Sequence, residues 1–106
     1  DLAAEPLAIE EHDLNSDGVN DIFMADARTC GSKGCEYILY LKLGDGCFQY
    51  VGQVDGHIAS VDATKSSFKI ITMKQKNGYL STEKIETFEF NMDQGIYKQR
   101  PVGNAN

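Results

Sequence analysis

Apolar and polar residues alternate with a period of two along most of this chain, which is the pattern of half-buried β-strands. Residues 36–43 show it most clearly, because Tyr37, Leu39, Leu41 and Leu43 fall on one face, opposite Glu36, Ile38, Tyr40 and Lys42. Strands are also expected at residues 22–25, 47–54, 57–62, 67–74, 82–91 and 96–100. We therefore predict an all-β fold, an antiparallel meander of about six to seven strands that is curled or two-layered, with room for one short helix.

Turn residues divide these segments. Gly44-Asp45-Gly46 and Asp55-Gly56 are expected turns, and Asn77-Gly78 is the strongest hairpin signal because type I′ turns need positive φ at both central positions. The pattern places Phe48, Tyr50 and Val54 on one face of the segment 47–54. A chain of 106 residues makes one domain. We expect an N-terminal segment at 1–12, a loop at 13–21 and a frayed tail at 101–106.

The loop at 13–21 reads Asp-Leu-Asn-Ser-Asp-Gly-Val-Asn-Asp and has the ligand spacing of a calcium site. Ca²⁺ prefers hard oxygen ligands, and alternate residues of a tight loop can supply them. The expected ligands are the side chains of Asp13, Asn15, Asp17 and Asp21 and the carbonyl of Val19. Gly18 permits the sharp turn. The alternative is an ordinary turn without metal, since Asn, Asp and Gly are also common turn residues.

This loop is not an EF-hand, because Met24 stands where the bidentate glutamate belongs and Ile22-Phe23-Met24-Ala25 begins a strand. A loop of the form Asp-x-Asn-x-Asp-Gly-x-x-Asp that leads into an apolar strand resembles the FG-GAP repeat of integrin-type propellers and its bacterial extracytoplasmic relatives. The resemblance covers about residues 12–25, with a weaker echo to residue 54. It implies calcium as the bound ion. The chain is too short for a closed propeller, since each blade takes about 40–50 residues.

The three cysteines are Cys30, Cys35 and Cys47. The first two flank a Gly-Ser-Lys-Gly stretch between two strands, so we expect a Cys30–Cys35 disulfide that clamps a hairpin. The spacing is not that of a Cys-x-x-Cys redox pair, and Cys47 and the two histidines do not complete a recognisable zinc set. Cys47 is expected to be a half-buried free thiol at a strand start, and the alternative is an intermolecular disulfide. A disulfide indicates an oxidising compartment, so we predict a periplasmic or secreted protein.

Charge is uneven along the chain. Residues 1–62 hold three Lys/Arg and twelve Asp/Glu, a net of −9, and residues 63–106 hold seven and four, a net of +3. A pI near 4.7 argues against nucleic acid, which calls for a basic surface. No apolar run is long enough to span a membrane.

The sequence carries no Gly-rich phosphate loop, no Gly-x-Ser-x-Gly and no His-Glu-x-x-His. Nothing orients Cys47 or Cys30 against His57 as nucleophile and base, so we do not expect an enzyme. We expect a calcium-stabilised module that binds a protein, of the kind of an inhibitor or immunity protein against a basic cell-wall-degrading enzyme. The alternative is a calcium-dependent carbohydrate-binding or structural domain, which would need a groove lined by exposed aromatics.

Hairpin tips are the expected partner contacts, since small β domains commonly present loops on a rigid sheet. They lie at residues 31–34, 44–46 and 76–79. The residues that we expect to touch a partner are Ser32, Lys33, Asp45, Asn77 and Tyr79.

Overall fold

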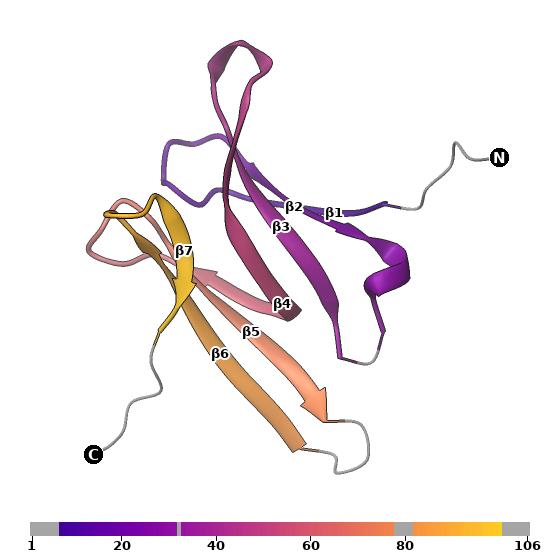
Figure 1. Ribbon diagram of the computed structural model, residues 1–106. Coiled ribbons are helices and arrows are strands. Elements are labelled where there is room, and N and C mark those ends of the chain that lie inside the picture. The colour runs from indigo at the N-terminus through magenta and orange to yellow at the C-terminus, as the bar shows by residue number, and fades with distance from the viewer. Residues whose placement is uncertain (1–6, 32, 78–81, 101–106) are drawn as a thin grey trace, which may run out of the picture.

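The computed structural model describes residues 7–31, 33–77 and 82–100, which form one antiparallel sheet (Figure 1). Its seven strands follow each other in chain order, each paired with the next. They are β1 (Leu7–His12), β2 (Asp21–Asp26), β3 (Cys35–Lys42), β4 (Phe48–Asp62), β5 (Ile70–Asn77), β6 (Thr82–Asn91) and β7 (Ile96–Gln99). In the described ranges, helical structure is limited to the 3-10 turns η1 (Ala27–Thr29) and η2 (Gly44–Gly46). The prediction of an all-β meander is confirmed.

Strand β4 belongs to two halves of this sheet (Figure 1). Its residues 48–56 pair with β3, and its residues 57–62 pair with β5. We call β1–β3 with residues 48–56 the first half, and residues 57–62 with β5–β7 the second half. The predicted turn at Asp55-Gly56 is wrong, because the strand continues through Gly56 at a φ of 120°. A glycine tolerates this conformation, so the strand bends there without ending.

A β-bulge in β4 shifts the alternation of inward and outward side chains along the strand, and a second prediction is wrong because of it. Tyr50 pairs with Tyr40, whereas the next partner, Leu39, pairs with Gly52, so Val51 is the extra residue. Val51 and Val54 are buried, while Phe48 and Tyr50 are exposed. The expectation that Phe48 and Tyr50 share a face with Val54 is therefore wrong, because the inserted residue reverses the alternation.

The two halves close on one core. Its buried side chains come from the 13–21 loop and from strands of both halves: Leu14, Phe23, Ala25, Tyr37, Leu39, Leu41, Val51, Val54, Ile71, Met73, Phe88 and Tyr97. Strand β7 also packs on β4, since a Cβ built on Gly52 would lie 3.2 Å from the backbone N and O of Tyr97. The sheet is therefore curled on itself, as the sequence predicted.

Residues 7–12 differ from expectation, because they form a full strand paired with β2 although the sequence there shows little alternation. Asn77 pairs with Thr82, so the predicted hairpin between β5 and β6 is confirmed. The turn expected at Asn77-Gly78 includes Gly78, which lies outside the described residues. The frayed tail expected at 101–106 and the first six residues of the N-terminal segment lie outside the described residues.

Candidate metal centre

The acidic loop connects β1 to β2, and its last residue, Asp21, is the first residue of β2. Asp13, Asp17 and Asp21 each offer a carboxylate oxygen, and these atoms lie within 4.8 Å of one another. Three converging carboxylates are ligands suited to a hard cation. These residues could therefore hold a metal ion.

Backbone hydrogen bonds fix the shape of the loop. The carboxylate of Asp13 accepts from the N–H of Gly18 at 2.9 Å and of Asp17 at 3.3 Å, and Asp17 Oδ1 accepts from the N–H of Val19 at 2.9 Å. Gly18 has a φ of 84°, so the glycine serves the turn as expected. Val19 thus lies in the same loop, and its carbonyl as a metal ligand stays a prediction.

Asp21 is the buried member of the set, with no solvent exposure. Its two carboxylate oxygens accept from the N–H groups of Leu14 and Lys42, each at 2.8 Å. Each oxygen has a second lone pair, which remains available to a cation. Burial raises the pKa of Asp21, and the charges of Asp17 and Asp13 raise it further. The two hydrogen bonds lower this pKa, but by less, so its net shift is upward. No ion pair reaches Asp21 from the described residues, so a bound cation is the partner that would offset this cost.

Asn15 lies against the carboxylates of Asp13 and Asp17. Its NH₂ group donates to Asp17 Oδ1 at 3.0 Å and to Asp13 Oδ1 at 3.2 Å. Asn15 is therefore hydrogen-bonded within the acidic loop, and its carboxamide oxygen as a metal ligand stays a prediction.

The pKa of Asp13 is shifted in the opposite direction to that of Asp21. The slight burial of Asp13 raises its pKa, but the hydrogen bonds from Gly18 and Asp17 and the charge of Lys69 outweigh this, so the net pKa is lowered. Asp13 is therefore ionised at neutral pH and ready to bind a cation.

The second half of the sheet supports this loop. The N–H of Lys69, in the β4–β5 connection, donates to the carbonyl of Leu14 at 2.7 Å. The hydroxyl of Tyr97 in β7 donates to the carbonyl of Lys69 at 2.8 Å, and the side chain of Leu14 is fully buried. Sequence analysis missed Leu14, Lys69 and Tyr97 as supporting residues, because their contacts span long sequence separations that no local motif marks.

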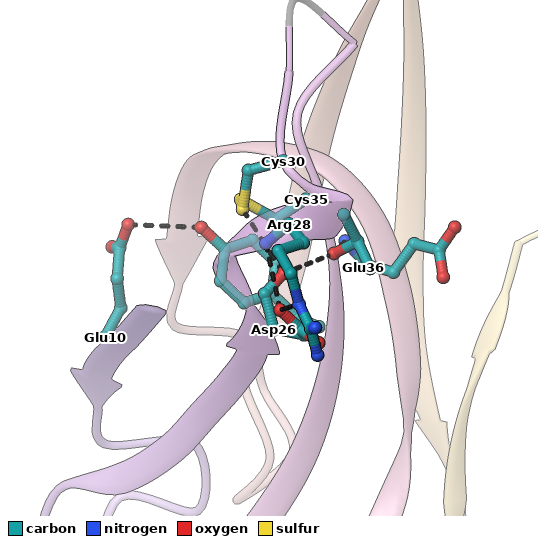
Figure 2. Close-up of a disulfide and its surroundings, with 8 residues drawn as sticks. Glu10, Asp26, Arg28, Cys30, Cys35 and Glu36 are labelled. Carbon is teal, nitrogen blue, oxygen red and sulfur yellow. Dashed lines mark hydrogen bonds and ion pairs between the residues drawn. A yellow bond between two sulfur atoms is a disulfide. The ribbon is translucent and has the colours of Figure 1, made fainter. Parts of the chain in front are cut away.

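The Cys30–Cys35 disulfide is present, as predicted, with Cα atoms 4.0 Å apart. Figure 2 shows it beside the Asp26–Arg28 ion pair, with Glu36 pointing away from it. Gly31 and Gly34 exchange two backbone hydrogen bonds across the loop that the disulfide closes. A disulfide fits an extracellular location. Cys47 is a free thiol as expected, but it is exposed rather than half-buried, because it precedes β4 at the end of η2.

The expected partner contacts do not form one surface. Lys33 and Asp45 are both exposed, but they precede and follow β3 and so lie at its opposite ends. Lys33 instead lines a hollow with Asp55 and Gln75, near the end of β5. Asn77 is the last residue of β5, while Ser32 and Tyr79 lie outside the described residues.

No family model, curated protein or solved structure matches this chain. The FG-GAP resemblance therefore rests on the loop residues alone and stays a prediction. Within the residues that the structure describes, no helix has the length and apolar character required to cross a membrane.

Proposed function

We propose that this chain is an extracytoplasmic, calcium-stabilised β domain that acts by binding another protein. The observation that carries the calcium assignment is the convergence of carboxylate oxygens from Asp13, Asp17 and Asp21. Carboxylates are hard oxygen donors, which favours Ca²⁺ over the softer metals. The spacing of these ligands along the sequence is that of a calcium loop, which favours Ca²⁺ over Mg²⁺.

The ion has a structural role in this proposal. It neutralises the buried charge of Asp21 and ties β1, β2 and the β4–β5 connection together through Leu14 and Lys69. A ligand that binds only the folded state stabilises it by about 2.7 kcal/mol at one hundred times its Kd. A single site of an extracellular module is expected to bind Ca²⁺ with a Kd of about 10⁻⁵–10⁻³ M.

Thermal unfolding in excess Ca²⁺ and in excess chelator tests the site. Each kcal/mol of stabilisation corresponds to about 4–8 °C in a domain of this size, so the melting temperature should rise clearly with Ca²⁺. Asp17→Ala should abolish the response. Asp93→Ala, an exposed residue in the β6–β7 turn, is the matched control and should keep it. Identical melting curves in Ca²⁺ and in chelator would overturn the assignment.

Protein binding is supported by charge and by the scaffold. Residues 1–62 carry a net charge of −9, which suits a basic partner and speeds encounter with it. A basic cell-wall-degrading enzyme is such a partner in the compartment that the disulfide indicates, and the domain would inhibit it by masking its surface. The domain itself carries out no chemistry in this proposal.

Carbohydrate binding is the second candidate, and one observation favours it. Tyr40 and Tyr50 form an edge-to-face pair on the outside of the sheet, with ring centroids 6.3 Å apart, and Tyr50 is 52% exposed. The apolar faces of sugar rings stack on exposed aromatic side chains. Retention on cell-wall oligosaccharides with no binding to any protein would favour this candidate over the first.

A further inference from the structure

The outer face of the first half is apolar. Side chains there point away from the core and are exposed or half-buried: Leu7, Ile9, Ile22, Met24, Ile38, Tyr40, Phe48 and Tyr50. Strand register places them side by side, since Ile9 pairs with Met24 and Met24 with Ile38. In the next row Ile22 pairs with Tyr40 and Tyr40 with Tyr50.

This apolar face is large and has a hollow in it. Phe48 is 49% exposed and Ile9 50%, and the whole face exposes on the order of 500 Å², within the range of about 300–600 Å² of the largest patch on a typical monomer. A hollow of about 180 Å³ is lined by Ile22, Met24, Tyr40 and Phe48. Binding surfaces concentrate their energy where an anchor side chain fills such a hollow.

The outer face of the second half shows that the fold does not require an apolar surface. Its outward positions are mainly polar, with Thr72 opposite Thr87, Lys74 opposite Ile85 and Glu89 opposite Lys98. Ion pairs join Lys74 to Glu83 at 3.7 Å and Arg100 to Glu89 at 3.5 Å. Ile85, 60% exposed, stands among these polar side chains, and Ile70 and Ile96 are half-buried on the same face.

Carboxylates border the apolar face. Glu36 and Asp55 stand opposite each other across β3 and β4, and Glu11 stands opposite Ile22 at the other side. Among the described residues, no ion pair reaches any of these three carboxylates. Asp26 is already bound by Arg28 at 2.6 Å. Lys42 is the outward lysine of this face, and Lys33 lies at the tip beside Glu36.

We propose that this outer face, rather than the hairpin tips, is the docking surface for a basic protein segment that carries apolar side chains. The apolar rows and the hollow of this face bind the apolar side chains of the partner, and the carboxylates of Glu11, Glu36 and Asp55 bind its lysine or arginine side chains. A second copy is a poorer occupant, because it would bring the same carboxylates against each other. A sugar is poorer too, because aliphatic side chains outnumber hydrogen-bonding groups on this face. The inference rests on the proposed protein-binding function and names the surface that performs it.

Selection of binders from a displayed library of random linear peptides tests the surface, with Ca²⁺ present throughout. The enriched peptides should combine lysine or arginine with aliphatic or aromatic residues. Ile38→Lys should weaken the binding of a synthesised winner at least tenfold. Ile85→Lys makes the same change on the outer face of the second half and should alter Kd less than twofold. Glu36→Gln, an exposed isosteric change that does not threaten folding, should weaken binding and reduce its dependence on salt.

The other outcomes separate this inference from the proposed function. Peptides that ignore Ile38→Lys but fail with Lys33→Ala or Asp45→Asn would refute the docking face and retain protein binding at the tips. A library that yields no binder would count against protein binding altogether. Self-association that Ile38→Lys abolishes would assign the face to a second copy. Oligosaccharide binding that Ile38→Lys and Tyr50→Ser abolish would assign it to a glycan.

Discussion

The two halves of the sheet share a strand and a core, yet their outer faces have opposite character. The first half carries the acidic loop, the disulfide and an apolar outer face. The second half carries cross-strand ion pairs on its outer face, and its β4–β5 connection and last strand support the acidic loop through Lys69 and Tyr97. In the function that we propose, the first half recognises the partner and the second half stabilises the first.

The largest expected effect comes from Gly56→Ala, because β4 passes from the first half to the second at Gly56. A Cβ there would lie 2.7 Å from the carbonyl oxygen of Lys74, and the φ of 120° disfavours any side chain. Backbone strain of about 1–2 kcal/mol and overpacking of about 1–3 kcal/mol lead us to expect Gly56→Ala to cost about 2–5 kcal/mol. Urea unfolding followed by circular dichroism measures this loss.

The control for Gly56→Ala is Gly44→Ala, since a Cβ at Gly44 meets nothing within 4 Å. It should change the free energy of unfolding by no more than about 0.5 kcal/mol. A Gly56→Ala variant as stable as Gly44→Ala would contradict the view that the halves are locked together at this position.

A smaller effect is expected from Tyr97→Phe, which removes the support that the second half gives to the loop. The lost hydrogen bond to Lys69 is worth about 1 kcal/mol. Transmitted in full to the site, this amounts to about a fivefold rise in the Kd for Ca²⁺, measured by calorimetry. Tyr50→Phe is the matched control, because Tyr50 is exposed on the outer face. Equal Ca²⁺ affinity in both variants would mean that the loop does not depend on the second half.

The smallest effect concerns the Asp26–Arg28 pair at the disulfide end of the first half. Hydrogen bonds from the Arg28 side chain and backbone, together with its charge, lower the pKa of Asp26 to about 2. The pair therefore stabilises the fold above the unfolded pKa of 3.8, and this contribution is lost as the pH falls toward 2. Because the pair is exposed, the change in stability should be slight.

An NMR titration of the Asp26 carboxyl group checks this directly. Arg28→Gln should raise its pKa toward 3.8, whereas Lys84→Gln, which breaks the Lys84–Glu86 pair of the second half, should leave it unchanged. A wild-type Asp26 that titrates near its ordinary value would show that the ion pair does not persist in solution.

Local patterns predicted the parts of the structure that depend on neighbours in sequence. The alternation in residues 36–43 located β3 and its buried Tyr37, Leu39 and Leu41, although Leu43 follows the strand and is exposed. The Asp13–Asp21 spacing located the acidic cluster. The bulge at Val51 was not predictable from alternation, because it depends on pairing with β3. The turn expected at Asp55-Gly56 failed because Gly56 serves the close approach of β5 to β4, which the sequence does not reveal.

The apolar outer face had a partial signal in the sequence. Ile38 and Tyr40 alternate with Leu39 and Leu41, so β3 is apolar on both faces although one side is solvated. A strand with one face exposed to solvent normally carries polar residues on that face. The apolar residues on the outer face of β3 could be read from the sequence. Placing Ile9 and Tyr50 on the same face required the strand register across three strand pairs.

Strand β1 lies at the edge of the sheet and bears on the solubility of the chain. An edge strand next to an apolar face is a template for uncontrolled strand addition and aggregation. Here Glu10 and Glu11 occupy that edge strand, with Glu10 bonded to His12 at 3.3 Å. Charged side chains on an edge strand oppose such strand addition, so Glu10 and Glu11 are expected to protect the exposed apolar face from aggregation.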